Sequence, residues 1–134
     1  MVYQLISQGD YCGALLLLEF IEEPTLMEQY NKCYCLYHTS KVEETIPILQ
    51  QLVSAVTDLT ELNKSALEAI HLELIQKMEQ PVPLVEELLQ TPLYVLIHMK
   101  WLYVLALRKC NLYEKAEIIA KSLETYLTIL TIVE

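Results

Sequence analysis

The chain has 134 residues, a formal net charge of −9, and 54% hydrophobic residues. This length fits one domain, and the apolar content excludes an intrinsically disordered chain. Only two glycines occur, and neither lies in a Gly-x-Gly-x-x-Gly or Walker-type sequence, which excludes the common phosphate-binding loops. An acidic chain repels phosphate backbones, so no nucleic-acid partner is expected.

Apolar residues recur with helical period along nearly the whole chain, and turn-forming residues interrupt them at short intervals. The pattern predicts an all-α fold in a single domain over residues 1–134. About eight helices are expected, over residues 2–8, 11–22, 25–38, 42–57, 60–79, 82–90, 92–110 and 112–130. Pro81 and Pro92 suit first helical turns. Pro47 falls inside the fourth predicted helix, where it should distort the backbone near Glu43.

The longest apolar stretch runs from Leu93 to Leu107 and contains His98 and Lys100. As a helix it would span about 22 Å, which is short of the ~30 Å hydrocarbon core of a bilayer. We therefore expect a buried helix and no membrane partner. The first residues lack a basic start and a long apolar core, so no secretory signal is expected.

Four cysteines occur, at positions 12, 33, 35 and 110. Cys33 and Cys35 fall inside a helical pattern, where residues two apart point to different faces and do not pair easily. Reduced thiols that pack as small apolar residues are expected instead. This predicts a cytoplasmic protein, with a nuclear one as the alternative.

Three segments of the chain share one spacing. A turn-forming residue is followed two positions later by a large apolar residue and five positions later by a small one. These positions are Gly9, Tyr11 and Ala14, then Ser40, Val42 and Thr45, then Asn111, Tyr113 and Ala116. The small residues are 31 and 71 residues apart, so a fourth, degenerate unit is expected between the last two. The predicted units are 1–24, 25–58, 59–91 and 92–134.

This spacing resembles the tetratricopeptide repeat (TPR), in which Gly-x-Tyr-x-x-Ala opens the second helix of each unit. The resemblance is best over Tyr30–Ile46 and Trp101–Ala120. Gln80–Pro83 replaces the turn expected in the third unit. The family implies a right-handed superhelical stack of antiparallel helix hairpins, a TPR-like α-solenoid that acts as a protein-binding scaffold. The repeats are also similar to those of the 72-kDa subunit of the signal recognition particle and of the anaphase-promoting complex scaffold subunits, which implies a subunit or fragment of a larger assembly.

The interpretation as a protein-binding scaffold predicts two contact regions. Asn31, Tyr34 and Tyr37 are the expected groove residues. Tyr94, Trp101 and Leu130 are the expected apolar interface, because the chain from residue 93 onward is rich in apolar residues. Docking of a chaperone's terminal carboxylate is a further alternative, for which Asn31 and Lys32 are the candidates. A homodimer is the alternative to a foreign protein or peptide.

Charge is uneven along the chain. Residues 1–98 hold four basic and fourteen acidic residues, a net charge of −10, whereas residues 99–134 have a net charge of +1. An acidic groove favours a basic partner peptide. An acidic surface that only contacts water explains the same counts equally well.

Chemistry at a metal or nucleophile is not expected. Cys33, Cys35 and His38 could be imagined as metal ligands, but a structural site needs four and no second ligand pair occurs. No Gly-x-Ser-x-Gly sequence or similar nucleophile motif is present. We therefore predict no enzyme, no cofactor and no metal, and keep a small metal- or thiol-using helical protein as the rival from another class.

Overall fold

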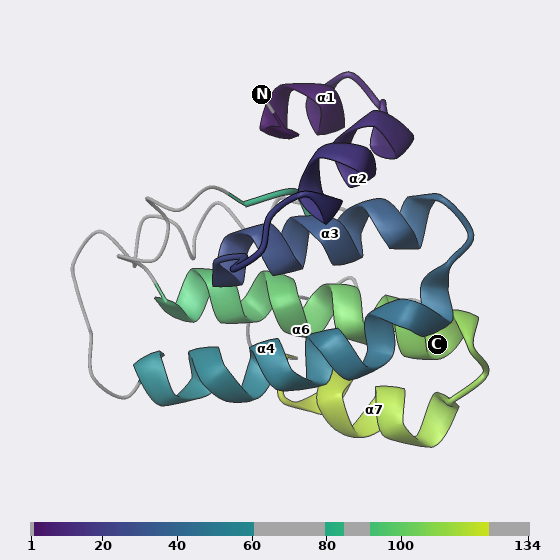
Figure 1. Cartoon of the computed structure of the whole chain (residues 1–134). Coiled ribbons are helices and arrows are strands. Elements are labelled where there is room, and N and C mark those ends of the chain that lie inside the picture. The colour runs from purple at the N-terminus through teal and green to yellow at the C-terminus, as the bar shows by residue number, and fades with distance from the viewer. Residues whose placement is uncertain (1, 61–79, 85–91, 124–134) are drawn as a thin grey trace.

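The computed structural model describes residues 2–60, 80–84 and 92–123 (Figure 1). Within these ranges it contains six α-helices, one 3-10 turn and no strand, which confirms the all-α prediction for this part of the chain. The α-helices are α1 (Val2–Ser7), α2 (Tyr11–Glu19), α3 (Leu26–His38), α4 (Thr45–Thr60), α6 (Pro92–Lys109) and α7 (Tyr113–Lys121), and the 3-10 turn is η1 (Val42–Glu44).

The predicted boundaries need several corrections. α2 and α7 are shorter than predicted, and Val82–Leu84 form no helix although one was expected over 82–90. Pro81 therefore opens no helix, because Pro83, two residues later, disfavours the helical backbone conformation at Val82. The predicted helix 60–79 and Leu130 lie outside the described residues, apart from Thr60 at the end of α4.

Helix starts follow local signals in the sequence. The Thr25 hydroxyl accepts from the Glu28 amide at 3.2 Å, and the Glu28 carboxylate accepts from the Thr25 amide at 3.0 Å, which forms a capping box at α3. The Asp10 carboxylate accepts from the Gly13 amide at 2.9 Å at the start of α2. These contacts stabilise the first turns of α2 and α3.

The distortion expected near Glu43 is confirmed as η1. This 3-10 turn precedes α4, so Pro47 is the third residue of the α-helix rather than an interior one. At that place the missing N–H has no intrahelical partner to lose. The proline is thus compatible with the first turn of α4.

The three segments with a shared spacing also share a turn. Gly9, Ser40 and Asn111 have positive φ values of 81°, 69° and 63°. In each turn the next amide donates to the carbonyl five residues earlier, which is the long bond of a Schellman cap. These bonds run from Asp10 to Leu5 (2.8 Å), from Lys41 to Leu36 (3.1 Å) and from Leu112 to Leu107 (2.9 Å). The sequence similarity therefore corresponds to one repeated helix–turn–helix geometry.

The helices pack as two hairpins with a smaller one beside them. In Figure 1, α3 and α6 run in one direction, and α4 and α7 run in the other. α4 packs against both α3 and α6, so the hairpin α3–α4 contacts the hairpin α6–α7 directly. α2 packs against α3, and α1 packs against α2.

α6 is the centre of the core. Every side chain from Tyr94 to Met99 is buried, because α4 and α7 pack on α6 and α3 also contacts it. The small repeat residues Ala14, Thr45 and Ala116 are 0%, 0% and 1% exposed. Their size lets the helices of each hairpin approach closely.

Candidate protein-binding site

α3 carries the three predicted groove residues at successive turns. Asn31 makes two hydrogen bonds with one residue, Leu84. Its Nδ2 donates to the Leu84 carbonyl at 2.7 Å, and its Oδ1 accepts from the Leu84 amide at 2.9 Å. Asn31 is 7% exposed. Its amide group therefore serves a contact within the chain.

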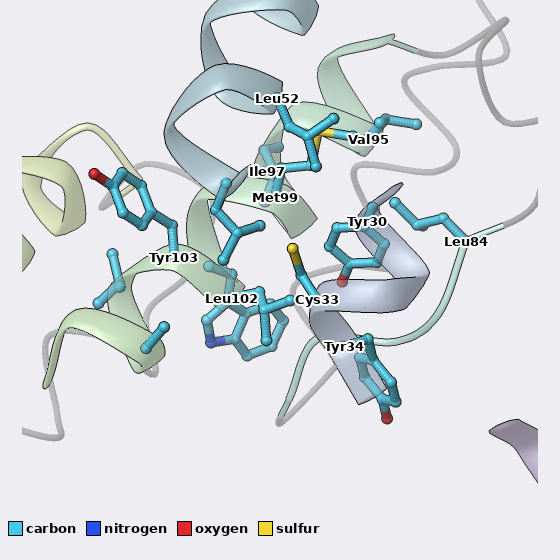
Figure 2. Close-up of a cluster of buried hydrophobic side chains, with 14 of the residues drawn as sticks. Tyr30, Cys33, Tyr34, Leu52, Leu84, Val95, Ile97, Met99, Leu102 and Tyr103 are labelled. Carbon is cyan, nitrogen blue, oxygen red and sulfur yellow. The ribbon is translucent and has the colours of Figure 1, made fainter. Parts of the chain in front are cut away.

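Leu84 belongs to the segment Gln80–Leu84, which α3 also holds through Tyr30. The Tyr30 hydroxyl donates to the Val82 carbonyl at 2.9 Å, one residue before Asn31 on α3. Figure 2 shows Leu84 beside Tyr30, on the thin ribbon that passes along α3. Leu84 is 1% exposed, so the segment is anchored by a buried side chain and by hydrogen bonds.

Tyr34 and Tyr37 meet around His38 near the end of α3. The His38 ring stacks on Tyr11 with a centroid distance of 4.7 Å, and its centroid lies 4.6 Å from Tyr34 and 5.3 Å from Tyr37. The Lys109 ammonium lies 4.3 Å from the centre of the Tyr37 ring. The structure thus brings two of the predicted groove residues together, through a histidine.

Burial favours the neutral forms of three side chains in this cluster, His38, Tyr34 and Tyr37. Burial lowers the pKa of His38, and the Lys109 charge lowers it further. Burial, with the charge and hydrogen bond of Tyr11 next in weight, raises the pKa of Tyr34 to about 12. Burial also raises the pKa of Tyr37. Tyr34 is only 6% exposed, so a partner here would meet the exposed His38 ring, the half-buried Tyr37 ring and the Lys109 ammonium instead.

The cysteines are all free thiols. Cys33 and Cys35 are fully buried on α3, and burial raises the pKa of each to about 12. Their thiolate forms are scarce at neutral pH, which disfavours nucleophilic attack and metal binding. In the ranges that the structure describes, no three His, Cys, Asp or Glu side chains are placed to hold a metal ion together.

The residues expected to form an apolar interface are placed differently. Tyr94 is 5% and Trp101 is 1% exposed, and both rings pack on the buried His98. Both side chains therefore lie inside the fold, because α6 is apolar all round and is covered on several sides. Leu130 lies outside the described residues.

Exposed apolar side chains occur instead on α2 and near α7. Leu16 is 61% and Phe20 is 83% exposed, and they lie four residues apart, on one face of α2 and at its C-cap. At the other hairpin, Tyr113 is 61% and Ile118 is 71% exposed. A signal for α2 was present in the sequence, because four consecutive leucines, 15–18, cannot all face one side of a helix.

A cavity of about 280 Å³ opens between α2, α3 and α4, and Glu19 and Ile21, the sequence neighbours of Phe20, contribute to its lining. Leu18, Ile21 and Ile48 give it apolar walls, and Glu19 and Glu28 add carboxylates. The other lining residues are Pro24, Gln29 and Lys32. The cavity could receive an apolar side chain that has basic neighbours.

Among the helices of the described ranges, none has the length and apolar character needed to cross a bilayer. Comparison with family models, with curated proteins and with solved structures finds no match to this chain.

Proposed function

We propose that this chain is a non-catalytic protein-interaction scaffold of the TPR type, acting as a subunit or fragment of a larger assembly. The repeated turn at Gly9, Ser40 and Asn111 supports this, because one helix–turn–helix geometry recurs on a shared spacing. Direct packing of one hairpin on another is the way in which such units bury their apolar faces.

The exposed pair on α2 carries the proposal most directly. Leu16 and Phe20 lie on the outer side of the α1–α2 hairpin, while Ala14 and Leu18 of the same helix are buried. Covering a large apolar side chain contributes roughly 1.5–3 kcal/mol. We therefore name Leu16, Phe20 and the adjacent cavity the α2 surface, and propose that another protein covers it.

The chemistry of the α2 surface favours a basic partner. Glu19 and Glu28 border the cavity, and Lys32 is the one basic residue of its lining. A helix or extended segment with one apolar residue flanked by Lys or Arg matches this combination. We further propose that the scaffold works in a reducing compartment, the cytoplasm or the nucleus, because all four cysteines are free.

Quantitative capture from a lysate of cells that express the chain tests this proposal. Three baits are compared: the unaltered chain, Leu16→Gln/Phe20→Gln, and the control Glu117→Gln, an exposed residue of α7 outside the α2 surface. At least one protein should be captured by the first bait and lost at least tenfold by the double variant, with the control retaining more of it. An identical set of captured proteins for all three baits would contradict the α2 surface.

Self-association is the second candidate, because the same exposed pair could meet its copy across a two-fold axis. Light scattering separates the two cases. A molar mass near twice 15.5 kDa that returns to 15.5 kDa in the double variant would replace the foreign partner by a second copy.

A further inference from the structure

The segment Gln80–Leu84 has the form of a bound peptide. It contains two prolines, it has no helix or strand, and it lies against α3 although more than forty positions separate it from that helix. Pro81 and Leu84 are buried, whereas Val82 and Pro83 between them are half-buried. A polyproline II helix has three residues per turn, so residues three apart share one face. The burial pattern therefore matches a polyproline II segment with Pro81 and Leu84 as its anchors.

The hydrogen bonds to this segment involve its backbone. The Tyr30 hydroxyl donates to the Val82 carbonyl, and the Asn31 side chain forms hydrogen bonds with both the amide and the carbonyl of Leu84. Backbone bonds of this kind do not depend on the side chains of the bound segment. Selectivity would come from the pockets that receive the two anchors.

The Pro81 end lies among aromatic and apolar side chains. A small cavity of about 70 Å³ next to Gln80 and Pro81 is lined by Tyr37 and His38 of α3 and by Leu102 and Leu105 of α6. Aromatic-lined grooves are the usual seats of proline-rich segments, because a polyproline II helix is already extended before it binds. The predicted groove residues Asn31 and Tyr37 thus lie at the two ends of one bound segment.

We propose that this face of α3, with the adjoining part of α6, is a site for polyproline II segments with the anchors Pro-x-x-Leu, and that Gln80–Leu84 occupies it as an internal ligand. A partner protein with such a segment would displace the internal one. This inference rests on the proposed role as a protein-binding scaffold and names the chemistry of a ligand, at a surface separate from the α2 surface.

The internal segment competes with any partner. A tethered segment acts at an effective concentration in the millimolar range, which weakens the apparent affinity of a free peptide for the unaltered chain. Weakening the internal segment should therefore strengthen binding of the free peptide. Pro81→Gly/Pro83→Gly does this by making the segment more flexible, and it leaves α3 and Leu84 unchanged.

Fluorescence anisotropy with a labelled, end-blocked peptide of residues 80–84 provides the test. The double-glycine variant should bind this peptide at least tenfold more tightly than the unaltered chain. Adding Asn31→Ala to the variant should weaken binding at least tenfold, and a control peptide with Leu84→Asp should bind at least tenfold more weakly. Absence of saturable binding by a variant whose circular dichroism matches that of the unaltered chain would overturn the proposal, and so would binding that is insensitive to Asn31→Ala.

A second measurement uses the unaltered chain, in case the variant does not fold. Millimolar peptide should speed hydrogen exchange at the Leu84 amide, because displacement removes its acceptor on Asn31; unchanged exchange would overturn the proposal. If the unaltered chain forms a dimer that Leu84→Ser abolishes, the occupant of this site is the segment of a second copy and not that of a partner protein. Peptide binding does not involve Leu16 or Phe20, so failure here and failure of the α2 surface give different results.

Discussion

His98 is a polar side chain in an apolar place. It is 0% exposed on α6, its ring packs on Tyr94 and Trp101, and neither ring nitrogen has a hydrogen-bond partner. Burial without a partner disfavours the charged ring, and it lowers the pKa of His98 to about 4. The residue therefore packs as a neutral ring in the core.

His98 should make the fold sensitive to acid. Because its pKa is about 4 in the fold and 6.5 when unfolded, the unfolded chain takes up the proton first as pH falls. This side chain should reduce the free energy of unfolding by about 1.4 kcal/mol per pH unit between these values, and by about 3 kcal/mol in total. Urea unfolding of the unaltered chain and of His98→Leu at several pH values measures it. Above pH 6.5 the difference in free energy of unfolding between the two proteins should be constant. A difference that stays constant down to pH 4 would contradict this role.

Asn31 should be a stabilising residue in addition to a binding one. Asn31→Ala leaves the buried amide and carbonyl of Leu84 without their partners, which should lower the free energy of unfolding by about 2–4 kcal/mol. Lys32→Ala, at the half-buried neighbouring position, is the control and should change it by less than about 1 kcal/mol. Equal losses in urea unfolding would mean that the two bonds to Leu84 contribute little.

At the scale of the elements, three turns determine where the hairpins reverse. A residue with a side chain is strained at positive φ, whereas glycine is not. Ser40 and Asn111 therefore adopt their turns at a cost in conformational free energy that Gly9 avoids. The same backbone hydrogen bond to the carbonyl five residues earlier offsets this strain at each of the three turns.

Ser40→Gly should therefore stabilise the chain, by about 0.5–1 kcal/mol. The same substitution at Ser54, which is exposed in the interior of α4, should destabilise it by about the same amount. Thermal unfolding of the two variants measures opposite shifts of Tm. Shifts of the same sign would show that the left-handed backbone at position 40 is not strained.

Pro47 should be nearly neutral for stability. Pro47→Ala should change the free energy of unfolding by less than about 1 kcal/mol, because the first turn of α4 loses no backbone bond to the proline. Gln51→Pro, one turn later on the exposed side, should cost about 3 kcal/mol or more. If Pro47→Ala alone stabilised the chain by that amount, the proline would be distorting α4.

Short-range features of these elements were predictable from the sequence. The turn residues, the start of α3 and the distortion near Glu43 depend on residues a few positions apart. The partner of Asn31 was not predictable, because Leu84 comes from a segment 53 residues later in the chain. The helix that carries Trp101 was expected to be buried, but the elements that cover it were not predictable, since an all-round apolar helix does not reveal its neighbours.

At the scale of the whole molecule, the two larger hairpins join through α4 and α6. This packing buries α6 and leaves the outer side of α2 with Leu16 and Phe20 exposed. Binding at the α2 surface should therefore leave the helical core intact. We therefore expect the contacts of the scaffold to lie on its outer hairpin and, after displacement of an internal segment, on α3.

Photo-crosslinking from Cys12 tests whether another protein covers the α2 surface. This exposed thiol lies one turn before Leu16 and two turns before Phe20, so a benzophenone attached to it reaches the α2 surface. The label is placed in a Cys110→Ser background, because Cys110 is the other partly exposed thiol. In a lysate of cells that express the chain, illumination should give an adduct heavier than 15.5 kDa that contains one defined partner and is lost in Leu16→Gln/Phe20→Gln. Recovery of the labelled chain at its own mass, or of the same adducts from the double variant, would contradict the claim that another protein covers α2.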